Sequence, residues 1–328
     1  MKFNELKLEK NILKALKEAG YSEPTPIQQQ AIPPVLEGRD LMGCAQTGTG
    51  KTCAFAVPII QRLAKSEGRK GTIRALILTP TRELALQIYE NVCQYARYMP
   101  VTAAVIFGGV SQVPQVEAIE RGVDILIATP GRLWDLMGQK IVKLDKAEFF
   151  VLDEADRMLD MGFFDDIMRI VSQLPSERQT IMFSATLPPK IRKLAKEIMH
   201  DPAEVNIAVS KPNEAIEQSA YVCYENQKMG IVRELFSKPT GTKTIIFSSS
   251  KQKVKELAFS LKRMKMNVAP MHSDLKQEQR EEVMLDFKNG KIDVLVATDI
   301  VARGIDIEDI GTVINFDVPH DPEDYIHR

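Results

Sequence analysis

A glycine-rich loop at residues 45–52 (AQTGTGKT) lies between a short predicted strand at 39–44 and a predicted apolar helix at 53–60. Small residues let backbone N–H groups close around phosphate oxygens, and the N-terminal end of the following helix adds positive potential. The loop departs from the usual phosphate-binding pattern at one position, because Ala45 stands where a glycine is expected. This context predicts a nucleotide-binding α/β domain.

An acidic tetrad at residues 153–156 follows the apolar run 149–152, which is typical of a buried strand. Lys51 can reach the β- and γ-phosphates of a nucleotide, and the Thr52 hydroxyl can bind Mg²⁺. Asp153 would complete the metal site, and Glu154 would orient or deprotonate the attacking water. The remaining loop residues expected to hold the phosphates are Ala45, Gln46, Thr47, Gly48, Thr49 and Gly50. The alternative is a glycine-rich turn and an unrelated surface tetrad, which the matching contexts of both segments disfavour.

Length and composition limit the class of protein. The chain has 328 residues, more than one core usually serves, so we expect two domains. It contains no apolar run of bilayer length and no signal peptide, and we therefore expect a cytoplasmic protein that does not bind membranes. Its four cysteines lack paired metal-ligand spacing. The net charge of −1 requires any nucleic acid to be held by a local surface, not by a general positive field.

Short apolar runs alternate with amphipathic stretches in two successive sets, which favours parallel sheets covered by helices on both faces. The first set comprises 75–78, 103–107, 125–128, 149–152 and 180–183, and the second comprises 244–247, 267–270, 293–297 and 312–316. Only the first set contains a phosphate-binding loop. We predict an N-terminal segment at 1–30, a nucleotide-binding domain at 31–207, a linker at 208–218 and a second α/β domain at 219–328.

Six further motifs occur along the chain: 20–28 (GYSEPTPIQ), 80–85 (PTRELA), 108–109 (GG), 129–132 (TPGR), 184–186 (SAT) and 302–306 (ARGID). Their order resembles that of the DEAD-box ATP-dependent RNA helicases, and in particular the bacterial RhlE-type subgroup. The resemblance covers essentially the whole chain. It implies two tandem RecA-like domains with doubly wound parallel sheets, the cofactors ATP and Mg²⁺, and a monomer acting on single-stranded RNA and short duplexes.

The resemblance makes residues 1–30 an adenine-reading segment. Gln28 offers one acceptor and two donors, which match the N6 and N7 edge of adenine. Phe3 would stack on the base or pack on Tyr21, and ordinary helix packing is an equal alternative for it. In the second domain, the family pattern also assigns Gly304 and Asp306 to ATP.

Several of the motifs follow buried strands, where α/β sheets bind ligands. Arginines there can contact phosphates, and glycines let a nucleic-acid backbone approach closely. By resemblance, the RNA-contacting residues are Pro80, Thr81, Arg82, Gly108, Gly109, Thr129, Pro130, Gly131, Arg132, Gln277, Arg280, Thr298 and Arg303. No base-edge reader is evident, so little sequence preference is expected. The alternative for the first-domain segments is a set of plain helix-starting turns. A polar turn at 248–250 could also donate hydroxyls to RNA, although a generic turn is the stronger interpretation there.

The family couples its two domains through residues that match Asp156, Ser184, Thr186, His327 and Arg328. A helix N-cap is the alternative for Ser184 and Thr186. The family continues beyond this point as HRIGRTGR, whose second and third arginines stabilise the transferring phosphoryl group. We therefore expect a chain cut within this motif, with an incomplete second domain and impaired turnover.

The function expected from these motifs is an ATP-dependent RNA helicase that grips the sugar-phosphate backbone and locally unwinds short duplexes. The alternative from another class is an ATP-dependent RNA clamp or scaffold with little turnover. A DNA translocase is disfavoured by the segment around Gln28 and by the acidic tetrad.

Overall fold

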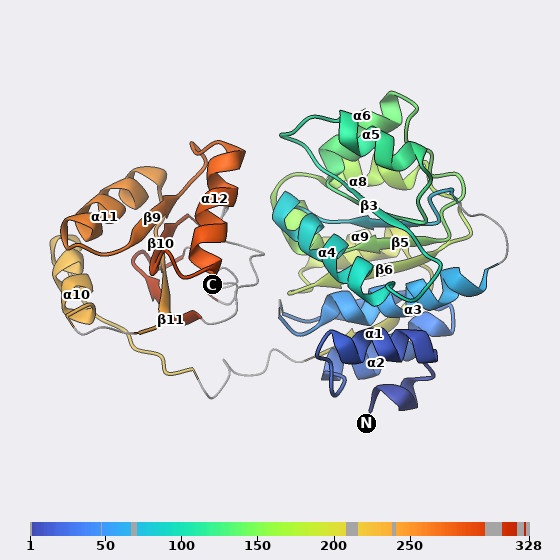
Figure 1. Cartoon of the computed structure of the whole chain (residues 1–328), viewed down its shortest axis with the longest axis horizontal. Helices are drawn as coiled ribbons and strands as arrows, with labels where there is room; N and C mark the ends of the chain where they lie inside the picture. The colour runs from blue at the N-terminus through green and yellow to red at the C-terminus, as the bar shows by residue number, and fades with distance from the viewer. Residues whose placement is uncertain are drawn as a thin grey trace. The chain divides into compact units, whose positions relative to one another are not determined.

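The computed structural model describes residues 2–46, 48–66, 71–207, 216–237, 241–298, 310–319 and 325. The chain divides into two compact units, Met1–Ser210 and Lys211–Arg328. In each unit the described strands form one parallel sheet with helices packed on it (Figure 1). The predicted fold class, two α/β domains with parallel sheets, is confirmed.

The first unit contains a seven-stranded sheet with the order β3-β4-β2-β5-β6-β1-β7. Its strands are β1 Leu41–Cys44, β2 Ala75–Leu78, β3 Ala103–Ile106, β4 Ile125–Ala128, β5 Phe149–Leu152, β6 Gln179–Ser184 and β7 Ala203–Asn206. The five strands between β3 and β7 are buried along their whole length, as a parallel sheet with two covered faces requires. Strand β7, an edge strand paired with β1, is absent from the sequence-based prediction.

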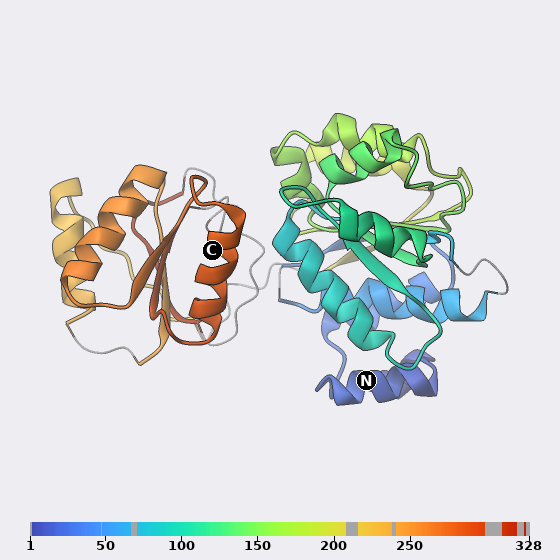
Figure 2. The same ribbon diagram turned by 45° about the horizontal axis from the view of Figure 1, so that its top comes forward.

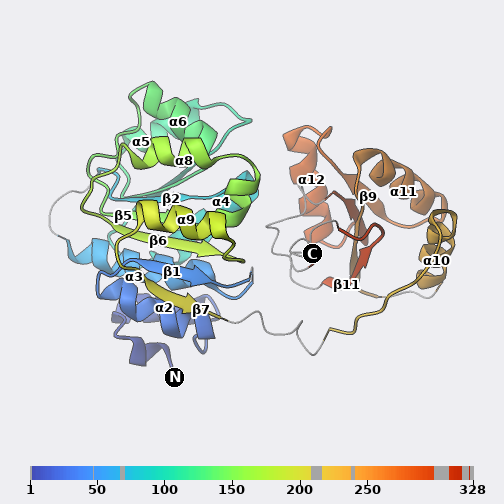
Figure 3. The same cartoon turned by 180° about the vertical axis from the view of Figure 1, so that it is seen from behind.

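Helices cover both faces of this sheet (Figure 3). They are α1 Lys10–Glu18, α2 Pro26–Leu36, α3 Lys51–Lys65, α4 Arg82–Tyr95, α5 Val113–Glu120, α6 Pro130–Gly138, α7 Ala155–Asp160, α8 Phe164–Val171 and α9 Pro189–Ile198, with a 3₁₀ turn at Phe3–Leu6. Successive strand residues alternate between two apolar cores. Ile77 and Val151 pack with α1 to α4, whereas Leu76 and Leu152 pack with α6 to α9. This alternation makes the sheet doubly wound.

The aromatic packing around strand β1 leaves room only for a glycine at position 43. A Cβ atom at Gly43 would lie 2.3 Å from the Phe183 ring, which packs on Phe55 with ring centroids 5.8 Å apart. We expect Gly43→Ala to lower the free energy of unfolding of the first unit by about 1–3 kcal/mol, because the buried rings must move. Urea unfolding followed by the fluorescence of Trp134, the chain's single tryptophan, measures this. Gly138→Ala is the matched control, since no atom lies within 4 Å of its new Cβ; equal losses in both variants would contradict the argument.

The second unit has a four-stranded parallel sheet in the order β11-β8-β10-β9. Helices of this unit lie against its sheet (Figure 2). Its elements are α10 Lys228–Leu235, β8 Lys243–Phe247, α11 Lys251–Arg263, β9 Val268–Met271, α12 Gln277–Lys288, β10 Val294–Ala297 and β11 Ile310–Asn315, with a 3₁₀ turn at Glu225–Gln227. Two smaller apolar cores lie on opposite faces of the sheet. One contains residues of α10 and α11, and the other contains Phe287 of α12.

The division between the units falls within the predicted linker 208–218, of which residues 208–215 lie outside the described ranges. Among the helices that the structure describes, none is both long and apolar enough to cross a bilayer.

Candidate active site

Two segments predicted to bind nucleotide and one predicted to couple the domains meet at one edge of the first sheet. Strands β5, β6 and β1 are neighbours in the sheet, and all run in the same direction. The glycine-rich loop, the acidic tetrad at 153–156 and the segment 184–186 each follow the carboxyl end of one of these strands. Ligands of open parallel sheets bind outside such carboxyl ends, so the strand order assembles one site from three distant segments.

A buried cation and a buried carboxylate face each other at this edge. The Lys51 Nζ atom lies 3.9 Å from the Asp153 Oδ1 atom, and the two residues are only 6% and 2% exposed. Within the described part of the chain, Lys51 Nζ has no hydrogen-bond partner. Burial raises the pKa of Asp153 to about 6, with Lys51 opposing the rise and Glu154 adding to it. The Lys51 ammonium lacks a hydrogen-bond acceptor, so it suits a phosphate group. The Asp153 carboxylate is only partly neutralised by Lys51, so it suits Mg²⁺.

The glycine-rich loop uses left-handed backbone at two glycines, Gly48 with φ of 80° and Gly50 with φ of 90°. Thr49 Oγ1 donates a hydrogen bond to the Gln46 carbonyl at 2.6 Å, which tightens the turn. Ala45, the departure from the usual pattern, does not have a positive φ, so a side chain costs nothing there. Thr52 lies in the first turn of α3, and Thr47 lies outside the described residues.

Gln28 connects helix α2 to the glycine-rich loop. Its Oε1 atom accepts a hydrogen bond from the Thr25 N–H at 2.9 Å, and its Nε2 atom donates to the Gly50 carbonyl at 3.2 Å. Thr25 adds a second connection, because its Oγ1 atom donates to the Thr49 carbonyl at 2.8 Å. Gln28 is fully buried in this arrangement, and its own two bonds occupy one lone pair of Oε1 and one hydrogen of Nε2. Adenine reading by Gln28 stays a prediction, and the role of Thr25 was missed.

Gln28→Ala is expected to reduce the preference for ATP over GTP, by roughly tenfold if a bidentate edge contact is lost. Measured dissociation constants for both nucleotides test this. Gln28→Glu serves as a matched control, because it retains the acceptor for Thr25 but sets an oxygen against the Gly50 carbonyl. If Gln28→Ala leaves the ratio unchanged while both affinities fall, the side chain only supports the loop.

Phe3 and Tyr21 lie at the N-terminal end of this region. Phe3 is 6% exposed and packs edge-on against Tyr21, with ring centroids 6.2 Å apart. The Tyr21 hydroxyl in turn lies 2.6 Å from the Tyr95 hydroxyl of α4. Of the arrangements considered from the sequence, the structure has Phe3 both packed on Tyr21 and included in the apolar core with residues of α1 to α4, and stacking on a base stays a prediction.

Glu154 is held by an arginine that the sequence did not single out. Glu154 lies in left-handed backbone with φ of 55°, and it is 7% exposed. Its Oε2 atom accepts a hydrogen bond from Arg157 Nη1 at 3.2 Å. The spacing of three residues at the start of α7 was the available signal, since such residues are neighbours on a helix. Left-handed backbone at a non-glycine residue is strained, and such strain concentrates at functional sites.

Asp156 joins the acidic tetrad to the segment after β6. Its Oδ2 atom accepts hydrogen bonds from the Ala185 N–H at 3.0 Å, the Thr186 N–H at 3.1 Å and the Thr186 hydroxyl at 3.3 Å. Ser184 is fully buried, and its hydroxyl has no partner among the described residues. Helix α9 begins at Pro189 with Pro188 as its N-cap, so neither Ser184 nor Thr186 caps a helix.

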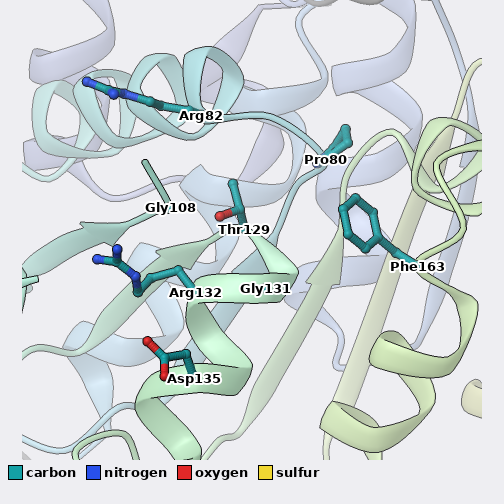
Figure 4. A pocket seen from close by; sticks show the side chains of 8 residues that line it. All are labelled: Pro80, Arg82, Gly108, Thr129, Gly131, Arg132, Asp135 and Phe163. Carbon is teal, nitrogen blue, oxygen red and sulfur yellow. The ribbon is translucent and has the colours of Figure 1, made fainter. Parts of the chain in front are cut away.

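A groove opens at the carboxyl ends of the neighbouring strands β3, β4 and β2, and its volume is about 410 Å³ (Figure 4). Its lining residues are Pro80, Arg82, Gly108, Thr129, Gly131, Arg132, Asp135 and Phe163. The structure thus brings together residues of three motifs that lie far apart in the sequence. Asp135 and Phe163 were missed, because nothing in their local sequence distinguishes them from other helix and turn residues.

The two arginines of the groove are held in place. Arg132 Nη2 donates to the Val110 carbonyl at 2.9 Å, and its buried Nη1 atom has no partner in the described ranges. The Arg82 guanidinium lies 4.4 Å from the centre of the Phe107 ring. A buried guanidinium nitrogen without an acceptor fits a phosphate oxygen.

The remaining first-domain residues serve the helix starts around the groove. Thr81 is the N-cap of α4, and Thr129 precedes Pro130 at the start of α6. Gly109 has a φ of 83°, which only glycine adopts freely. Helix-starting turns are therefore present at this sheet edge, and RNA contact by the same segments stays a prediction.

The second unit places its candidate residues at the carboxyl ends of its own strands. Thr298 follows β10, and Gln277 is the first residue of α12. Arg280 Nη2 donates to the Ser273 carbonyl at 3.1 Å. The candidates Arg303, Gly304, Asp306, His327 and Arg328 lie outside the described residues.

The polar turn after β8 is anchored to Asp317, a buried carboxylate after β11. The Oδ2 atom of Asp317 accepts hydrogen bonds from the hydroxyls of Ser248 and Ser249, both at 2.9 Å. Lys228 and Lys253 each donate to its Oδ1 atom at 2.9 Å. Although burial opposes it, these bonds and the Ser249 N–H hold the pKa of Asp317 far below its ordinary value. Two of the turn's hydroxyls therefore serve the protein's own structure.

A parallel α/β sheet with a glycine-rich loop after β1 and an acidic segment after β5 defines the P-loop class of nucleotide-binding proteins. The family model described as DEAD/DEAH box helicase matches residues 25–194, and the helicase conserved C-terminal domain matches residues 227–328. The chain belongs to the DEAD-box helicase family.

Curated relatives and solved structures agree with this assignment. The chain is 43% identical to the ATP-dependent RNA helicase CshA of Limosilactobacillus reuteri, with 100% of this chain and 66% of CshA covered. It is 41% identical to the DEAD-box ATP-dependent RNA helicase RhpA of Helicobacter pylori, with 99% and 66% covered. The structure of S. cerevisiae Dbp5 bound to RNA and ADP BeF3 has a TM-score of 0.87 at 33% identity, with 100% and 85% covered. The chain thus spans just under two thirds of the length of these two curated relatives.

Proposed function

We propose that this chain forms the core of an ATP-dependent RNA helicase that hydrolyses ATP to ADP and phosphate and locally parts short RNA duplexes. The observation that carries the proposal is the single sheet edge that bears both the buried Lys51–Asp153 pair and the groove with its two arginines. Within the family, the motif sequences favour the RhlE-type subgroup. The proposal includes a monomer that acts in the cytoplasm.

The ATP-binding half of the proposal uses charges already in place. Lys51 would compensate the β- and γ-phosphates, and the loop N–H groups would hold their oxygens. Thr52 and Asp153 would hold Mg²⁺, which would neutralise charge on the transferring phosphoryl group. Glu154, held by Arg157, would orient or deprotonate the attacking water.

The RNA-binding half rests on the groove. Arg82 and Arg132 would contact phosphates, and Gly108 and Gly131 leave open space for a sugar-phosphate chain, since no atom lies within 4 Å of a Cβ built on either. Contacts of this kind fix a strand without reading its bases. The resemblance of this fold to Dbp5 bound to RNA and ADP BeF3 supports the assignment of RNA as partner.

ATP hydrolysis measured with RNA, with DNA and without nucleic acid tests the proposal, together with strand separation of a short RNA duplex. In a protein extended through the expected HRIGRTGR motif, we expect turnover that RNA stimulates and DNA does not. RNA binding without turnover would indicate the clamp instead, and equal stimulation by DNA would indicate a translocase.

A further inference from the structure

Helix α6 exposes the chain's single tryptophan, which does not itself line the groove but lies three residues after Gly131, which does. Trp134 is 39% exposed, whereas Leu133 and Leu136 of the same helix are fully buried. Residues three or four apart are neighbours on a helix surface, so Trp134 and Asp135 both adjoin Gly131, which lines the groove. Because Gly131 has no side chain, nothing at this position would separate the Trp134 ring from an RNA strand lying in the groove.

The surroundings of Trp134 suit a nucleic acid better than an apolar protein surface. The Arg169 guanidinium of α8 lies 5.8 Å from the centre of the Trp134 ring. Arg169 is mostly exposed, and its Nη1 atom lies 3.5 Å from the Asp166 Oδ1 atom. Phe163, the N-cap residue of α8, lines the groove itself. Aromatic rings next to exposed cations are the combination that binds single-stranded nucleic acids.

We propose that Trp134 is a stacking residue for a nucleobase of the RNA strand held in this groove. The inference rests on the proposed function, because it requires RNA at Arg82 and Arg132. It adds a base contact to a groove that otherwise meets only sugar and phosphate. Every base has a π-face, so stacking on Trp134 strengthens binding with little sequence preference.

The single tryptophan makes this contact directly measurable. Stacking of a base on the indole ring changes the fluorescence of the tryptophan. The full chain is titrated with a single-stranded oligoadenylate of roughly ten nucleotides, in the presence of Mg²⁺ and a non-hydrolysable ATP analogue. We expect this titration to quench Trp134 fluorescence. An oligomer of the same length with abasic ribose units has the same phosphates and no bases. It should bind without quenching.

Affinity measurements with labelled oligomers then test the energetic contribution of the ring. Trp134→Leu should weaken binding of the oligoadenylate by roughly five- to tenfold, the lower part of the range for base–aromatic stacking. Its affinity for the abasic oligomer should not change. Trp134→Phe should restore most of the loss, and Val113→Ala, at a 60% exposed apolar position in the same unit, is the matched control.

Arg132→Ala separates this inference from the proposed function. If the oligoadenylate does not bind, or binds equally well to Arg132→Ala, the groove is not the RNA site, and both the assignment and the inference fail. If binding depends on Arg132 but Trp134 is not quenched and Trp134→Leu binds both oligomers normally, the groove holds RNA and only the stacking role of Trp134 is overturned. Circular dichroism of each variant shows whether it has folded.

Discussion

Replacing Lys51 by alanine is expected to abolish ATP hydrolysis, with a fall of at least roughly 10²–10³-fold, and to weaken nucleotide binding strongly. The ammonium is buried, so no water replaces its charge opposite the phosphates. Asp153 also loses the cation that holds its pKa down, and this carboxyl will then bind Mg²⁺ less readily near neutral pH. Turnover and nucleotide affinity, measured as a function of Mg²⁺ concentration, test the prediction.

Lys65→Ala is the matched control for Lys51→Ala. Lys65 is the last residue of helix α3, of which Lys51 is the first. The Lys65 side chain is 61% exposed, and its Nζ atom lies 3.3 Å from the Glu9 Oε1 atom. Its removal should leave turnover unchanged. Turnover in Lys51→Ala comparable to that of Lys65→Ala would show that the phosphates bind elsewhere.

Glu154→Gln should behave differently from Lys51→Ala, because it removes the charge that activates water and leaves Asp153 intact. We expect ATP binding to persist, hydrolysis to fall by roughly 10²–10⁴-fold, and a complex with ATP and RNA to accumulate. The amide oxygen of glutamine can still accept the hydrogen bond from Arg157, so the local geometry should survive. Single-turnover hydrolysis and the lifetime of the RNA complex measure the two effects.

Arg157→Ala shows whether Glu154 acts on water or only pairs with Arg157. If pairing is its whole role, removal of Arg157 should reproduce the loss seen in Glu154→Gln. We expect the smaller effect from Arg157→Ala, because the carboxylate that activates water remains. Failure of Glu154→Gln to bind ATP would make Glu154 a structural or metal-binding residue and sink the assignment.

The sheets were predictable because strands of a doubly covered parallel sheet are nearly continuous apolar runs. Ala75–Leu78, Ile125–Ala128 and Phe149–Leu152 form such runs and are fully buried. Strand β7 does not follow the rule. In Ala203–Asn206 only Val205 is buried, because this edge strand is bounded by solvent, and its short, mixed sequence resembles a loop.

The sequence by itself determined the fold class, and it predicted the chemistry of the glycine-rich loop and the acidic tetrad, because their signals are local: a run of residues, a glycine that permits positive φ, a carboxylate after a strand. Only the tertiary structure decided which segments meet. The strand order sets the loops after β3, β4 and β2 around one groove and joins Gln28 to Gly50. It also places Trp134 of α6 beside Arg169 of α8. Such contacts depend on the order and register of distant strands and helices, which no local pattern specifies.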